Sequence, residues 1–151
     1  MVVDLQSEWY TEPRQIAQFL YELMQEYSGE LGIRYVGLNE KLRPEYPAVI
    51  VMPGMKNKEI HATHTYNVRI ETSILVYHAN LNNSTVARTI DDLRLVEGIE
   101  AVIEQGEVNL RGHVIFAYVR DAFPGTIQRP TGEQVIGTRM LVETLTQKRF
   151  G

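Results

Sequence analysis

The sequence has 151 residues and no cysteine, and its 15 basic and 19 acidic residues give a net charge of −4. This length fits one domain with a sizeable core, and the missing thiols exclude disulfides, cysteine catalysis and Cys-ligated zinc. The acidic balance argues against a protein that mainly grips nucleic acid, and no apolar run approaches the ~20 residues of a membrane span. The N-terminus has neither a basic start nor an apolar core, so we expect no signal peptide.

The N-terminal part predicts an arm followed by a helix. Residues 1–12 form the arm, with Trp9 and Tyr10 as apolar anchors, and residues 13–151 form one α+β body. Pro13 suits the first helical turn and Gly29 suits the stop. Between them, an apolar stripe recurs at helical spacing. The stripe consists of Ile16, Phe19, Leu20, Leu23 and Tyr27.

Two or three strands are predicted next. GIRYVGL reads as a short strand, and the apolar run 48–52 between two prolines reads as a buried strand with defined ends. Residues 53–63 are predicted to be a partly basic loop that carries Met55, Lys56 and Lys58. Residues 63–78 alternate between apolar and polar, which predicts one long strand with a single apolar side. The apolar side consists of Tyr66, Val68, Ile70, Thr72, Ile74 and Val76.

The segment NNSTVARTIDDLRLVEGIEAVIEQG predicts a second helix. Asp91 and Asp92 are expected on its polar side, and Gly98 marks a bend or break because glycine costs about 1 kcal/mol relative to alanine in a helix. The expected apolar side consists of Val86, Ile90, Leu93 and Val96, continued by Ile99, Val102 and Ile103.

Two further strands close the chain. GHVIFAYVRD is nearly apolar on both faces, and EQVIGTRMLVETLTQK alternates over its whole length. Residues 121–133 are expected to be a long connection rich in Pro and Gly, which contains Phe123 and Arg129. The predicted fold is α+β: one mixed, mostly antiparallel sheet with two long hairpins, and two main helices packed on it. Because exposed strand edges invite association, the hairpins 48–78 and 113–147 are expected to contact other subunits.

No chemistry-bearing motif emerges from the chain. His61 and His64 have a spacing that suits a metal on a helix, but on a strand they point to opposite faces and no third ligand is near. No GxGxxG, GxxxxGK[ST] or G-x-S-x-G pattern occurs. Catalytic residues, cofactor and metal are therefore all expected to be absent.

Charged residues on the two long strands leave two alternatives open. Glu71 and Glu143 lie on the polar faces, with Arg69 and Arg139 close by in the sequence. They form either a cross-strand charge ladder, in which each pair contributes roughly 0.2–1 kcal/mol, or a subunit contact. The full candidate interface consists of Trp9, Tyr10, Met55, Lys56, Lys58, Arg69, Glu71, Phe123, Arg129, Arg139 and Glu143.

The order of these features resembles the tail terminator (tail completion) proteins of long-tailed bacteriophages. An N-terminal amphipathic helix precedes YPAVIV at 46–51 and the long strand YNVRIETSILVY at 66–77. The helix STVARTIDDLRLVEGIEAVIEQ and the closing strands HVIFAYVRD and QVIGTRMLVETLT follow. The resemblance covers residues 13 to 147 and consists of an order of elements with one loose motif.

The resemblance implies a structural virion protein without enzymatic activity, assembled in the host bacterial cytoplasm. Such a protein forms a ring of six copies at the head-proximal end of the tail tube, where it ends tube polymerisation and presents a surface to neck proteins. Its partners would be its own copies, the tail tube protein, a neck or head-completion protein and, through the N-terminal arm or residues 121–133, a sheath protein. DNA would pass through the lumen without specific binding, and no membrane is involved.

Two alternatives stay open. One is another neck or head–tail connector component, or the cap of a phage-like injection machine. The other is an oligomeric α+β domain that binds a small molecule, which would have a closed cavity with converging polar groups.

Overall fold

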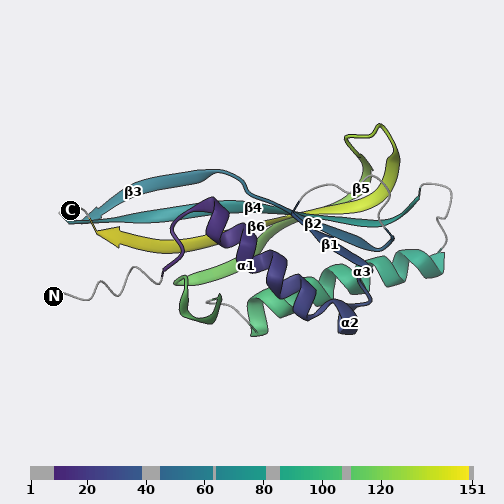
Figure 1. The fold of residues 1–151 in the computed structure, drawn as a ribbon, viewed down its shortest axis with the longest axis horizontal. Helices are drawn as coiled ribbons and strands as arrows, with labels where there is room; N and C mark the ends of the chain where they lie inside the picture. The colour runs from purple at the N-terminus through teal and green to yellow at the C-terminus, as the bar shows by residue number, and fades with distance from the viewer. Residues whose placement is uncertain (1–8, 39–44, 63, 81–85, 107–109, 150–151) are drawn as a thin grey trace.

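A computed structural model describes residues 9–38, 45–62, 64–80, 86–106 and 110–149 (Figure 1). Short π-helical and 3-10 turns, Val102–Gly106 and Leu110–Gly112, follow the third helix. The main elements are α1 (Pro13–Glu26), α2 (Ser28–Leu31), β1 (Tyr35–Gly37), β2 (Ala48–Met52), β3 (Lys56–Ala62), β4 (Thr65–Asn80), α3 (Val86–Ala101), β5 (Phe116–Gln128) and β6 (Gln134–Arg149).

The strands form one mixed sheet in the order β1-β2-β4-β6-β5, and β3 pairs with β4 beyond the end of β2. Among the strands that the structure describes, only the β1–β2 pair is parallel. The predicted fold class, an α+β domain with one mostly antiparallel sheet and two main helices, is confirmed. Its centre is the β4–β6 pair, since both strands have 16 residues and pair along their whole length.

Both hairpins contain more strand than the sequence predicts. Residues 56–62, predicted to be loop, form β3, and Lys56 lies opposite Ile70. β5 runs on to Gln128, so the predicted connection 121–133 is mostly strand. The apolar alternation that reveals a strand needs one buried face, which the polar β3 largely lacks. Pro124 suggested a turn, but β5 is an edge strand, where a missing N–H is tolerated.

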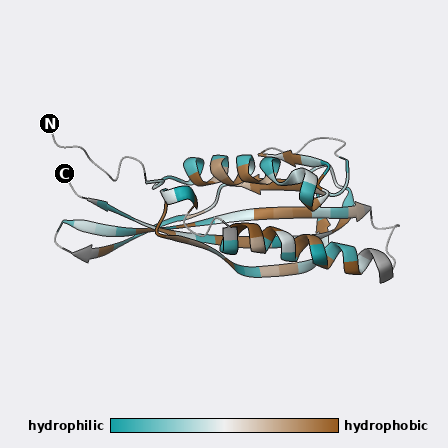
Figure 2. Cartoon of the chain, turned by 90° about the horizontal axis from the view of Figure 1, so that it is seen from below, coloured by the Kyte–Doolittle hydropathy of each residue, from teal (hydrophilic) through white to brown (hydrophobic). Residues whose placement is uncertain are grey.

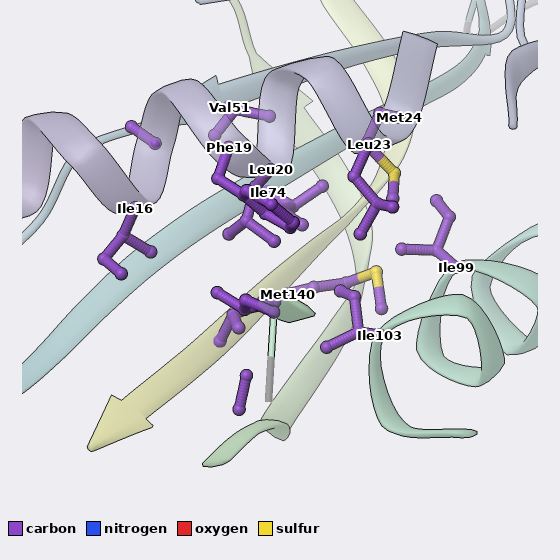
Figure 3. Close-up of a cluster of buried hydrophobic side chains, with 14 of the residues drawn as sticks. Ile16, Phe19, Leu20, Leu23, Met24, Val51, Ile74, Ile99, Ile103 and Met140 are labelled. Carbon is purple, nitrogen blue, oxygen red and sulfur yellow. The ribbon is translucent and has the colours of Figure 1, made fainter. Parts of the chain in front are cut away.

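The main core lies on one face of the sheet, between the strands and both helices, and a smaller buried cluster of Ala48, Ile50, Tyr77 and Val135 lies on the other face. α1 contributes Ile16, Leu20 and Leu23, and all three are fully or almost fully buried. Figure 3 shows these side chains meeting Ile74 of β4 and Met140 of β6. The predicted apolar side of β4 is confirmed, because its even-numbered residues from 66 to 76 are all buried.

Only part of the predicted apolar side of α3 faces the sheet. Ile99 and Ile103, both predicted on that side, are buried, and so is Leu95, whereas Ile90 and Leu93 are about half exposed. Asp92, expected on the polar side, approaches a buried histidine of β4. Apolar residues lie on both sides of this helix, so spacing alone did not identify its core side.

Asp92 and Gly98 both help to determine how α3 packs against its neighbours. The Asp92 carboxylate lies 3.4 Å from His78 Nδ1, and His78 Nε2 lies 2.9 Å from the Thr138 hydroxyl of β6. Gly98 does not break the helix as predicted, since α3 continues to Ala101. A Cβ at Gly98 would lie 2.7 Å from Leu31 Cδ2, so glycine allows α2 to approach closely.

One end of the sheet extends beyond the helices. β3, the start of β4 and the end of β6 continue to the left of α1 in Figure 1, and we call this three-stranded end the projecting arm. Its strands are mostly teal or white, whereas the strands between the helices are brown (Figure 2). The expected projection of the first hairpin is therefore confirmed.

Gly54 is the point where the chain passes from β2 to β3. A Cβ there would lie 2.0 Å from the Glu71 carbonyl oxygen, and the Glu71 N–H donates to the Met55 carbonyl at 2.9 Å. Gly54→Ala is expected to lower the free energy of unfolding by about 1–3 kcal/mol, because the backbone of β4 must move. Urea unfolding followed by circular dichroism measures this loss.

Gly29→Ala is the matched control, because no atom lies within 4 Å of the added methyl group. Gly29 belongs to α2, so alanine is expected to stabilise the protein by up to about 1 kcal/mol. Equal effects at the two positions would show that the close approach at Gly54 does not constrain the strand crossing.

Candidate interaction surface

The face of the sheet opposite the core, which we call the outer face, carries no helix in the part of the chain that the structure describes. It mixes charged, polar and apolar side chains. Directly paired residues share a face, so the β4–β6 register defines its centre. The pairs are Asn67 with Gln147, Arg69 with Leu145, Glu71 with Glu143, Ser73 with Leu141 and Leu75 with Arg139.

A compact group of charges occupies the middle of the outer face. Glu71 and Glu143 lie directly opposite each other, an arrangement that would be repulsive without cations. Arg120 lies 2.9 Å from Glu71 and 3.7 Å from Glu143, and Arg69 lies 3.7 Å from Glu143. The Tyr118 hydroxyl donates to Glu143 at 2.5 Å. These contacts are made within one chain, so the cross-strand ladder describes them better than a subunit contact does.

Arg120 was missed in the sequence. A register shift between Val119 and Asp121 leaves Arg120 as the extra residue of a β-bulge, and the bulge brings it to the two carboxylates. The alternation of residues along a strand does not reveal a bulge, so the sequence of β5 could not predict which face Arg120 occupies. Arg139, which the sequence suggested as a partner of the two glutamates, lies outside this group of charges, opposite Leu75 on β4 and Phe123 on β5.

An open, mostly apolar groove lies beside the charge group. A hollow of about 540 Å³ is lined by Met52, Pro53, Gly54, Met55, Glu71, Ser73, Leu75, Ile127 and Arg139. A second hollow of about 320 Å³ shares Met52 and Leu75 with it and extends the groove toward Tyr77 and Pro130. Phe123, 54% exposed, lies across from Arg139 on the same face. Arg139 has no ion-pair partner among the described residues.

Arg129 supports one wall of this groove and does not project from the surface. It is only 2% exposed, its guanidinium lies 2.6 Å from Glu133 and 3.3 Å from the Tyr46 hydroxyl, and it stacks over Tyr77 at 5.8 Å. Burial, followed by the hydrogen bond to Glu133, raises the pKa of Tyr46. The expectation that Arg129 contacts another subunit is corrected accordingly, since its side chain is used inside the chain.

The aromatic anchors of the N-terminal arm are placed only in part, because residues 1–8 lie outside the described residues. Tyr10 stacks on His113 with ring centroids 4.0 Å apart, and its N–H donates to the His113 carbonyl at 2.7 Å. Trp9 is half-buried beside it. Residues 9–12 are therefore attached to the body of the subunit near the start of α1.

The predicted basic residues lie at the base of the projecting arm. Lys56 forms a 2.6 Å ion pair with Glu12, which precedes α1, and the hydrogen bond from Lys56 lowers the pKa of Glu12. Lys58 lies 5.3 Å from the centre of the Tyr66 ring. Ile60, which the sequence did not single out, is 77% exposed.

The described residues offer little for other kinds of site. No three His, Asp or Glu side chains in this part of the chain gather closely enough to hold a metal ion. No helix among the described residues is long and apolar enough to cross a membrane. The surface features that stand out are instead the open groove and the projecting arm.

Comparison with known proteins adds no further constraint. No protein-family model and no curated protein sequence matches the chain. A function must therefore be inferred from the chain's own surfaces.

The hydrogen bond from Tyr118 to Glu143, aided by desolvation, raises the pKa of Tyr118 above its usual value of 10.0. A raised pKa means that this contact stabilises the fold fully below pH 10, and that the contribution is lost as pH rises through the folded-state pKa. Glu143→Gln is expected to bring the pKa of Tyr118 back toward 10. NMR titration of ring-labelled tyrosine measures the shift, with Tyr118→Phe identifying the signal. An unchanged pKa in Glu143→Gln would contradict the assigned cause.

Proposed function

We propose that this chain is a structural subunit of a phage tail: a tail terminator that forms a ring at the head-proximal end of the tail tube. The observation that carries this proposal is the pair of unpaired strand edges of the projecting arm, together with an outer face on which the described residues place no helix. A second copy, the tube protein or a neck protein would supply the missing cover. The order of elements, which resembles that of tail terminators, gives the proposal its specific form.

The edges of the projecting arm support association. Among the described residues, β3 pairs only with β4, and β6 beyond Leu145 also pairs only with β4. Both outer edges of the arm are therefore open to another strand or loop. Ile60, near the tip, adds an exposed apolar side chain. Extended backbone of this kind reaches beyond the body and enlarges the area buried with a neighbour.

The charges of the outer face favour a structural role over a catalytic one. Glu71 and Glu143 are engaged by Arg120 and Arg69, and Tyr118 occupies a further acceptor position of Glu143. Carboxylates arranged in this way hold three strands together. The groove beside them is open along the sheet and does not enclose a small ligand, which disfavours a small-molecule-binding domain.

The test is assembly of a tail tube protein from the genome that encodes this chain, with and without the chain. With the wild-type chain, electron microscopy should show short tubes with a disc at one end. Ile60→Asp is expected to reduce the capped fraction about 10- to 100-fold at limiting concentration, because an isoleucine side chain buried on contact contributes about 1.5–3 kcal/mol.

Ile60→Val is the matched control, since it keeps an apolar side chain of similar shape and should cap tubes almost as well as the wild type. Normal capping by Ile60→Asp would show that the arm does not touch the tube. A wild-type chain that never binds tubes, and leaves their length unchanged, would refute the terminator function itself.

A further inference from the structure

The outward side of α3 is an unusual surface for an isolated subunit. Ile90 and Leu93 are 48% and 51% exposed, and they lie one turn apart on the side of the helix opposite the buried Ile99. Glu97 follows one turn later, because residues at i, i+3 and i+7 share one face of a helix. Together, Ile90, Leu93 and Glu97 form an outward stripe of two apolar side chains followed by a carboxylate.

The groove on the outer face has the complementary composition. It exposes Met52, Met55 and Phe123 around Leu75, and its cation, Arg139, has no ion-pair partner among the described residues. Glu97 likewise has no ion-pair partner in the described part of the chain. The stripe and the groove lie on opposite faces of the sheet, so one copy cannot join its own.

We propose that α3 of one copy lies in the outer-face groove of the next copy, with Ile90 and Leu93 against the apolar lining and Glu97 paired with Arg139. This contact rests on the proposed ring and specifies how its neighbours meet. Because two different surfaces of the same chain are joined, the contact is head-to-tail, and such contacts close into a ring when the rotation closes.

The proposed contact would cover the outer face of the sheet, which has no helix against it in a single copy's described residues. In the part of the chain that the structure describes, helices cover one face of the sheet only, and the neighbour's α3 would supply a layer on the other. An amphipathic helix in an apolar groove, anchored by residues one turn apart, is a recurrent way for proteins to bind. Burial, followed by repulsion from Glu104 and Glu97, raises the pKa of Glu100, so a cation brought to this helix would also relieve crowded negative charge.

Charge reversal tests the proposed pair. Glu97→Arg and Arg139→Glu should each weaken assembly at least about 10-fold, whereas the double variant should recover most of it, because the pair is restored with opposite polarity. Sedimentation velocity over a range of concentrations, with the full chain alone and with tail tubes, measures assembly. Glu30→Arg and Arg14→Glu are the matched controls, since both are exposed and lie outside the stripe and the groove.

The outcomes separate this contact from the terminator function. Rings that cap tubes but tolerate both reversals would overturn the α3–groove contact and leave the function standing. The expected reversal pattern without tube capping would leave the contact standing and refute the function. A wild type that stays monomeric with and without tubes would overturn both. Loss in both single variants without recovery in the double would overturn the pairing of Glu97 with Arg139.

Engineered cysteines provide an independent test, because the chain has none of its own. The variant Leu93→Cys/Phe123→Cys places one thiol on the stripe and one beside the groove, on opposite faces of the same copy. Oxidation should give a ladder of covalent oligomers up to the ring size on a non-reducing gel, and each single substitution should stay monomeric. A double variant that gives no species above a dimer would overturn the head-to-tail contact.

Discussion

The antiparallel pairing of β4 with β6 sets the geometry of every other part of the subunit. These two strands pair from Thr65 with Arg149 to Asn80 with Val135, which spans both the helix-covered body and the projecting arm. Since successive side chains point to opposite faces, this ladder assigns the residues from Thr65 to Tyr77 alternately to the core and the outer face, up to the register shift between Tyr77 and Ala79. At one end the ladder continues past α1 and forms the projecting arm, whose two outer strand edges are unpaired among the described residues (Figure 1).

The two faces solve different physical problems. On the core face, apolar side chains of the strands meet α1 and α3, and the burial of this surface is the main favourable contribution to folding. On the outer face, opposed carboxylates are tolerated because Arg120 and Arg69 lie between the strands. The bulge in β5 thus places Arg120 where it can stabilise the opposed Glu71 and Glu143 of the β4–β6 pair. The apolar groove beside this group leaves a surface that a neighbouring chain can cover.

The sequence was most informative where one face of an element is buried. The alternation of β4 predicted its buried side correctly, and four of the five stripe residues predicted for the first helix are buried, the exception being Tyr27, which follows α1 and is partly buried. Burial imposes a strict period on both elements. β3 was missed because its side chains are mostly solvated, and the end of β5 was missed because Pro124 and Gly125 resemble a turn. Within the candidate surface, Lys56 and Lys58 were predicted to lie in a loop, whereas they belong to strand β3, and only Met55 precedes the strand. The position of Arg120 depends on a β-bulge, and the burial of Arg129 depends on contacts with residues far away in the sequence, such as Tyr77. Neither could be predicted from the residue pattern of its own strand.

The buried contact between His78, Asp92 and Thr138 has a consequence for how α3 is oriented. Apolar side chains lie on two sides of this helix, since Leu95 and Ile99 are buried while Ile90 and Leu93 are about half exposed. The observed setting keeps the Asp92 carboxylate 3.4 Å from His78 Nδ1, and a rotation that buried Ile90 and Leu93 instead would separate the two groups. This polar contact in the core therefore favours the rotation of α3 that leaves Ile90 and Leu93 on the surface of the subunit.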